Sequence, residues 1–201
     1  MNQLPVHTQA LRSEQRRKQL LAAAAECFRS SGFHGASIAR ISKVAGMSPG
    51  HIYHFFQNKE EIIAAIVEER VAHSLELIAR LKSEDKVFDA AIENVDEVVT
   101  ERTDPAYAGL WLEVLAEAAR NPRVARLVQT ADEKTRQYVT QLEKIARKSR
   151  SIESETKLDA ITEVAMSMID GLSNRVISNP DLDREEVIRV VRIGLQAILS
   201  A

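Results

Sequence analysis

Residues 37–56 (SIARISKVAGMSPGHIYHFF) constrain the fold of this chain more than any other segment. Two short stretches with the apolar spacing of helices flank a turn at 45–47, and a serine precedes each stretch, at Ser37 and Ser48. Serine is a preferred N-cap, and proline is tolerated at the first helical position, which is the position of Pro49. The segment therefore predicts two helices joined by a tight turn, a helix-turn-helix.

The apolar residues of this segment are spaced so that the two helices pack together and against Phe28 and Phe33. They are Ile38, Ile41, Ala45, Met47, Ile52 and Phe56. The second helix would then present small or polar side chains outward, and Gly50 would let its backbone come close to a partner.

Little in the rest of the chain interrupts helix formation, because its 201 residues include only seven glycines and five prolines. Aromatic residues make up only 4%. We therefore expect an all-α protein with about nine helices. Gly32 is expected to end the first of them as a C-terminal cap. The expected helices span 13–31, 38–44, 49–55, 59–81, 87–101, 105–120, 122–150, 153–178 and 183–200.

Charge is unevenly distributed along the chain. Residues 1–63 contain eight Lys or Arg and four Asp or Glu, whereas the whole chain has a net charge of −2. A basic N-terminal segment joined to an acidic remainder is expected where only the N-terminal segment contacts the phosphates of a nucleic acid. Two of its cations, Arg40 and Lys59, lie near helix N-termini, where the helix dipole disfavours positive charge by about 0.3–1 kcal/mol. Bound phosphate would supply the missing negative charge; the alternative is that both are solvated surface cations.

Several classes of protein are disfavoured by the sequence. Cys27 is the single cysteine and lies on an apolar helical stripe, so we expect a core residue and no intrachain disulfide. No signal peptide or membrane-spanning run is found, and we expect a cytoplasmic protein. His51 and His54 have no evident third ligand nearby. Glycine-rich phosphate loops and nucleophile motifs are also missing, so we expect no metal, no cofactor and no enzymatic activity.

The stretch from about Arg16 to Ile66 resembles the TetR family of transcriptional regulators. The likeness rests on the Gly-Phe at 32–33, the Ser-x-x-x-Ile-Tyr-x-x-Phe pattern that begins at Ser48, and the Asn-Lys-Glu at 58–60. It covers about a quarter of the chain, and a weaker similarity to choline-type and drug-efflux regulators lies further along, around LWLEVLAEAARNPRVAR. The resemblance implies an N-terminal three-helix helix-turn-helix domain and a C-terminal helical domain for ligand binding and dimerisation.

The resemblance also implies roles in DNA binding. Tyr53 would donate its hydroxyl to a phosphate, and His54 would touch the backbone. His51 is the expected reader of base edges, with Arg40 and Gly50 beside it. The alternative for Tyr53 is that it is a half-buried aromatic residue without a DNA contact. The alternative for Ser37 and Ser48 is that they only cap their helices. The candidate DNA-binding residues are Ser37, Arg40, Ser48, Pro49, Gly50, His51, Tyr53, His54 and Lys59.

The last two expected helices fit the family's dimer interface, a four-helix bundle formed by two subunits. The segment VIRVVRIGLQAILS is apolar on nearly two faces, so one face is left for a partner. The preceding helix offers small residues on one side. The candidate interface residues are Ser167, Gly171, Asn174, Val187, Val191 and Ile198. A monomeric core is the alternative.

In the family, the middle helices surround a ligand cavity. Candidate lining residues here are Phe88, Tyr107, Trp111, Leu115, Met166 and Asp170. Glu113 or Asp170 would supply charge and favour a cationic or hydrogen-bonding effector. The alternative is that the aromatic and methionine residues are plain core.

These observations lead to one expected function and two alternatives. We expect a flexible arm at 1–12, a helix-turn-helix domain at 13–63 and a ligand-binding and dimerisation domain at 64–201. The protein would be a homodimeric repressor on a palindromic double-stranded DNA operator, released by a small-molecule effector. A helix-turn-helix protein without an effector is the first alternative, and an all-helical enzyme is the second.

Overall fold

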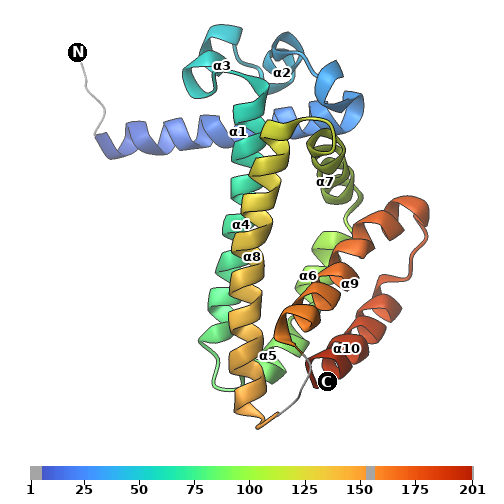
Figure 1. The fold of residues 1–201 in the computed structure, drawn as a ribbon. Helices are drawn as coiled ribbons and strands as arrows, with labels where there is room; N and C mark the ends of the chain where they lie inside the picture. Colours follow the sequence, from blue (N-terminus) through green and yellow to red (C-terminus); the bar gives the residue numbers. More distant parts are fainter. Residues whose placement is uncertain (1–5, 153–156, 201) are drawn as a thin grey trace. The chain divides into compact units, whose positions relative to one another are not determined.

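The computed structural model describes residues 6–152 and 157–200, and all regular structure in these ranges is helical (Figure 1). The expected all-α class is therefore confirmed. The helices are α1 (Val6–Gly35), α2 (Ile38–Ala45), α3 (Pro49–Phe55), α4 (Lys59–Lys82), α5 (Val87–Glu93), α6 (Val95–Arg102), α7 (Pro105–Ala118), α8 (Pro122–Ser149), α9 (Leu158–Ser178) and α10 (Arg184–Ser200). None of these helices is long and apolar enough to cross a membrane.

The described chain forms two compact units. Unit 1 contains the residues up to Glu68 together with Glu113–Leu127. Unit 2 contains Glu69–Leu112 and the residues from Val128 onward. The first division falls inside α4, a few residues beyond the position expected from the sequence. The return of the chain to unit 1 at the end of α7 was not expected.

The first helix begins earlier than the sequence analysis placed it. Residues 6–12, expected to belong to a flexible arm, are helical, and 1–5 lie outside the described residues. The run TQALRSEQRRKQ is rich in strong helix formers, which accounts for this extension. At Gly32 the backbone leaves the helical conformation, with φ 70° and ψ 166°, a region open essentially to glycine alone. A second short helical segment then continues to Gly35.

Unit 1 has a core built from all of its helices. Phe28 and Cys27 of α1 are buried with Ile41 of α2 and Ile52 of α3. The expected packing of the helix-turn-helix is confirmed, because Ala45, Met47 and Phe56 are buried as well and Ile38 is half-buried. Val114 and Val124, from the second stretch of unit 1, are also buried.

Two element boundaries in unit 2 differ from expectation. The helix expected over 87–101 breaks at Asn94 into α5 and α6, and the Asn94 side chain donates to the carbonyl of Ala90 (2.9 Å). Asparagine competes in this way with the backbone hydrogen bonds of a helix. The helix expected from residue 153 begins at Leu158, and 153–156 lie outside the described residues.

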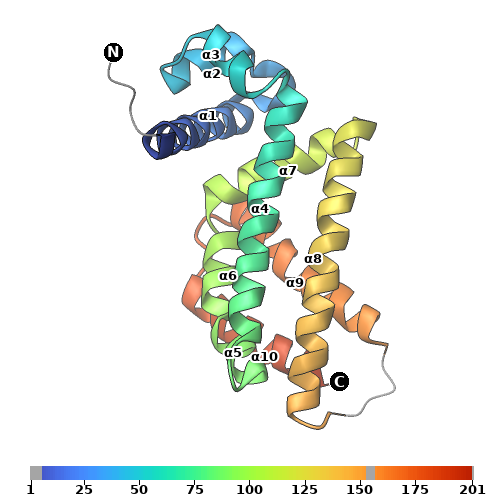
Figure 2. The ribbon, with the colours of Figure 1, turned by 90° about the vertical axis from the view of Figure 1, so that its left-hand side faces the viewer.

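Unit 2 contains two apolar clusters. The first joins α4, α5, α8, α9 and α10 through Ile78, Leu81, Val87, Phe88, Leu142, Ala146, Ile161 and Leu199. The second joins α6, α9 and α10 through Val95, Val99, Leu172 and Val191. Figure 2 shows these helices from the side. Both clusters take the same side of α10, and its opposite side remains exposed.

Candidate nucleic-acid interface and effector site

The helix-turn-helix is held by the local contacts that its sequence predicts. Ser37 Oγ accepts a hydrogen bond from the N–H of Arg40 (3.1 Å), and Ser48 Oγ accepts one from the N–H of His51 (3.2 Å). Gly46 ends α2 with φ 62°, and its N–H donates to the carbonyl of Lys43 (3.3 Å). Both serines are therefore caps, and a glycine supplies the left-handed turn that other residues adopt rarely.

The outer face of α3 is exposed to solvent. Pro49, Gly50, His51 and His54 are exposed, and Tyr53 keeps 48% of its surface accessible. A Cβ built on Gly50 would meet no atom within 4 Å. Because the opposite face is anchored by the fully buried Ile52, this helix presents a rigid polar surface to solvent.

The two cations near helix N-termini have partners inside unit 1. Lys59 Nζ donates to the carbonyl of Phe33 (2.6 Å) and lies 4.5 Å from the centre of that ring. Arg40 Nη2 lies 3.4 Å from Ser30 Oγ. Burial raises the pKa of the Cys27 thiol, and the nearby Arg40 opposes that rise. Lys59 therefore has a structural partner within unit 1, and its contact with phosphate stays a prediction from the sequence.

The next helix, α4, is capped by Asn58. Asn58 Oδ1 accepts from the N–H of Glu61 (2.9 Å), and Glu61 Oε2 accepts from the N–H of Gln57 (2.7 Å). The Glu61 carboxylate thus binds the backbone N–H of Gln57, the residue before the cap, much as in a capping box. This fixes the segment that leads from α3 into α4.

In unit 2, three of the expected effector residues meet around two arginines. The Arg70 guanidinium lies 3.7 Å from the centre of the Trp111 ring and 5.1 Å from that of Tyr107. Arg102 lies 5.0 Å from the same tyrosine ring and donates to its hydroxyl. Asp170 Oδ1 accepts from both arginines at 3.3 Å. We call these five residues the arginine–aromatic cluster.

Burial changes the ionisation of this cluster. It lowers the pKa of Arg70, and the neighbouring charge of Arg102 lowers it further. It raises the pKa of the Tyr107 hydroxyl to about 12, although both arginines oppose that rise. Arg70 Nη1 is buried and has no hydrogen-bond partner among the described residues. The cluster therefore holds an incompletely satisfied cation beside two aromatic rings.

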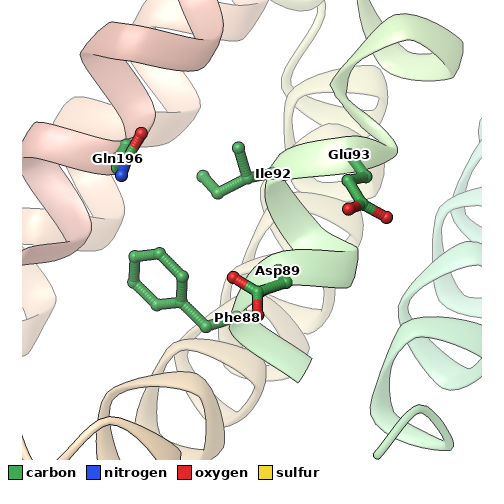
Figure 3. Close-up of a pocket in the computed structure, with 5 residues that line it drawn as sticks. All are labelled: Phe88, Asp89, Ile92, Glu93 and Gln196. Carbon is green, nitrogen blue, oxygen red and sulfur yellow. The ribbon is translucent and has the colours of Figure 1, made fainter. Parts of the chain in front are cut away.

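The remaining effector candidates lie elsewhere. Phe88 is buried in the first apolar cluster and lines a cavity of about 160 Å³ together with Asp89, Ile92, Glu93 and Gln196 (Figure 3). Pockets for small molecules usually measure about 300–1,000 Å³, so this cavity is too small for an effector. Met166 is half-buried on α9, and Leu115 belongs to unit 1.

The candidate dimer residues fall on two sides. Ser167 and Asn174 are exposed on α9, and a Cβ on Gly171 would meet open space. On α10, Val191 is buried in the second apolar cluster, Val187 packs against that cluster and Ile198 packs against the first. Val191 is therefore a core residue of its own subunit, whereas half-buried Val187 and Ile198 stay predicted interface residues. The exposed apolar residues of α10 are Val190 (54%) and Ile193 (59%).

Comparison with known proteins matches this organisation over most of the chain. The family model described as "BetI-type transcriptional repressor, C-terminal" covers residues 83–200, and "Bacterial regulatory proteins, tetR family" covers 20–66. The chain belongs to the TetR family. Its fold, helix-turn-helix and regulatory class are therefore those of DNA-binding transcriptional regulators rather than enzymes.

Individual relatives agree with this assignment. The transcriptional regulator UidR of Escherichia coli K12 is 28% identical over 192 residues, which cover 92% of this chain and 91% of UidR. The solved structure of Salmonella enterica GusR has a TM-score of 0.73, 26% identity and coverage of 91% and 96%. FadR from Bacillus subtilis, solved with stearoyl-CoA, has a TM-score of 0.77, 18% identity and coverage of 90% and 97%.

Two carboxylates have roles within unit 1 of this TetR-family chain that the sequence did not predict. Glu113 Oε1 accepts from the N–H of Phe33 (2.6 Å), so this residue is engaged by backbone rather than free for an effector. The Glu117 side chain is 1% exposed, 3.1 Å from His34 Nε2, and accepts from the Asn121 amide (3.0 Å). Neither contact has a local sequence signal, because the partners in α1 are remote along the chain.

Arg70 and Arg102 were missed as well, although the sequence held a signal for both. Arg70 follows Ile63, Ile66 and Val67 on the apolar side of its helix, and Arg102 follows the valines of α6 at the same spacing. A cation on an apolar stripe must be buried with a partner or reach a site.

Proposed function

We propose that this TetR-family regulator is a dimeric repressor that binds a palindromic double-stranded DNA operator and is released by a small-molecule effector. The observation that carries the proposal is the outer face of α3, which is exposed and polar while Ile52 anchors its opposite face. Such a helix fits the major groove of DNA, where base pairs present distinct patterns of donors and acceptors.

Residues on and beside α3 divide between reading and positioning. His51 reads base edges, with Arg40 beside it, and Gly50 lets the backbone approach. Tyr53 and His54 contact phosphates, as do the capping residues Ser37 and Ser48 and the first residue of α3, Pro49. Lys59 contributes through Phe33, whose carbonyl it holds.

A dimer would supply a second α3 helix for DNA recognition. Val164 and Ile177 are exposed on α9, and Val190 and Ile193 are exposed on α10. An apolar surface of this kind on paired helices is suited to a bundle with a second copy. Ser167, Gly171 and Asn174 let the helices approach closely. The dimer would place two α3 helices about 34–36 Å apart, one turn of DNA.

DNA binding is tested with a duplex recovered by selection from random sequences and with single-base variants of it. Fluorescence anisotropy should show that His51→Ala loses on the order of 1–3 kcal/mol of discrimination at one base pair. Tyr53→Phe, which removes a phosphate contact, should weaken all duplexes about equally. A uniform loss with His51→Ala would contradict its role as the base reader.

Release by an effector is tested through the single tryptophan. We propose that the effector binds at the arginine–aromatic cluster, so a compound that releases the duplex should change Trp111 emission with the same midpoint. Such release requires different affinities for the free and DNA-bound conformations. If no compound in a broad library releases the duplex, the regulator without an effector is the better description.

A further inference from the structure

We infer that the arginine–aromatic cluster is a subsite for the carboxylate of an organic acid, held by Arg70 and Arg102. The inference rests on the proposed effector function and specifies the chemistry of the molecule that the site takes. It reverses the expectation from sequence that an acidic residue selects a cationic effector, because the acid in question already has two cationic partners.

The first support is the state of Arg70. Its side chain is 16% exposed and its Nη1 has no hydrogen-bond partner among the described residues. A guanidinium carries five N–H donors in a fixed plane that matches a carboxylate. Leaving a buried donor of a charged group unpaired costs stability. The Nη1 donors of Arg70, free within the described residues, are therefore available to a ligand acceptor.

The second support is the sharing of one oxygen. Asp170 Oδ1 is 3.3 Å from both Arg70 and Arg102, so a single carboxylate oxygen serves two guanidinium groups. Arg102 has further partners in Glu101 (2.6 Å) and the Tyr107 hydroxyl. Within the described ranges, Arg70 has this one long hydrogen bond besides its contacts with the aromatic faces. The Asp170 carboxylate thus marks the position that a ligand carboxylate would take between the two arginines.

The third support is access and shape. The Asp170 side chain is 43% exposed, whereas those of Arg70 and Arg102 are 16% and 10% exposed, so a ligand would reach the arginines at the position of Asp170. The Trp111 ring lies against Arg70, and the Tyr107 ring lies beside both arginines. These surfaces suit a ligand that joins a carboxylate to an apolar ring or chain. An organic acid would compete with Asp170 and occupy its place.

Three probes of one skeleton separate the possibilities: phenylacetate, 2-phenylacetamide and 2-phenylethylammonium. Binding is followed by Trp111 emission in the purified full-length protein and in Asp170→Ala. Removing the competing carboxylate should lower the phenylacetate midpoint roughly tenfold or more, since charge-assisted hydrogen bonds to both arginines become available. If Asp170 instead binds a cationic ligand, Asp170→Ala should bind 2-phenylethylammonium more weakly than the natural protein does. Its affinity for phenylacetate should then be unchanged, and this result would overturn the inference.

Arginine variants in the Asp170→Ala background identify the donor. Arg70→Gln should abolish the increase in phenylacetate affinity that Asp170→Ala causes. Arg70→Lys keeps a positive charge and should retain part of that increase. Arg80→Gln, which alters an exposed ion pair with Glu97, is the matched control and should leave the increase intact. Circular dichroism verifies folding of each variant. Phenylacetate binding that survives Arg70→Gln and Arg70→Lys unchanged would contradict the subsite.

The test separates this inference from the proposed function. If a neutral or cationic compound releases the operator and changes Trp111 emission, while no carboxylate binds either protein, the effector function stands and the carboxylate subsite falls. If phenylacetate binds Asp170→Ala through Arg70 but no compound of any charge releases the operator from the natural protein, the subsite stands and the effector function falls.

Discussion

Glu113 Oε1 accepts a hydrogen bond of 2.6 Å from the backbone N–H of Phe33, 80 residues earlier in the chain. The N–H needs this partner because Gly32, one residue before it, breaks α1. A new helical segment leaves its first N–H groups without carbonyl partners. The carboxylate of α7 therefore acts as a cap that is supplied from a distant part of the sequence.

This cap should be measurable in the stability of the protein. Glu113→Ala should lower the free energy of unfolding by about 1.5–3 kcal/mol, the range for hydrogen bonds to charged groups. Urea denaturation followed by circular dichroism measures the change. Glu113→Gln retains a hydrogen-bond acceptor, so its free energy of unfolding should fall by less than that of Glu113→Ala. Equal stability of the alanine variant and the natural protein would show that the contact does not stabilise the fold.

Lys59 separates a structural role from a DNA contact. Lys59→Met should lower the free energy of unfolding by about 1 kcal/mol, because the Phe33 carbonyl loses its donor. The slope of log K against log salt for operator binding should stay unchanged. A phosphate contact would instead reduce the slope by roughly one per half-site. Lys43→Met, an exposed lysine of α2, is the control for stability.

The exposed face of α10 should be required for dimerisation. Ile193→Asp should give monomers in sedimentation velocity, since a buried charge at the interface has no partner. The fold of the subunit should be unaffected, as the side chain is exposed within it. Ile145→Asp on α8 alters another exposed isoleucine and should leave the assembly intact. Dimers that persist in Ile193→Asp would place the interface elsewhere.

Glu143 should make stability depend on pH. Burial raises its pKa above the ordinary 4.5, against the opposing effects of Thr162 and Arg147. A carboxyl with a raised pKa in the folded state stabilises below the unfolded value, and that contribution is lost as pH rises through the folded value. Glu143→Gln should therefore be more stable than the natural protein at pH 7, with the advantage disappearing below about pH 4.5.

Thermal unfolding across this pH range measures the effect. Glu133→Gln, an exposed acid on the same helix, should change stability little at any pH. If Glu143→Gln is less stable than the natural protein at pH 7, the hydrogen bond from Thr162 outweighs the cost of burying the charge.

The sequence predicted the helix-turn-helix in detail because its determinants are local. The capping residues Ser37 and Ser48, the turn at Gly46 and the buried Ile41 and Ile52 all lie within one short segment. Contacts across long sequence separations could not be predicted in the same way. Asp170 meets Arg70 from 100 residues away, and no pattern in either helix specifies the other.

The periodicity of α10 shows a different limit. Its sequence has two apolar faces, and the spacing identifies both, but spacing alone does not say which one meets the rest of the subunit. Val191 faces the apolar cluster of its own subunit, and Ile193 faces solvent. The assignment needed the positions of α6 and α9, against which α10 packs.

Unit 1 is discontinuous in sequence, and this limits how such regulators can be recombined. A fragment that ends at Glu68 would leave the Phe33 N–H without Glu113 and His34 without Glu117. A chimaera that joins this DNA reader to another effector domain must therefore transplant residues 113–127 as well. Residues 113–127, which complete unit 1, are separated from the rest of it in the sequence by 44 residues of unit 2, Glu69–Leu112.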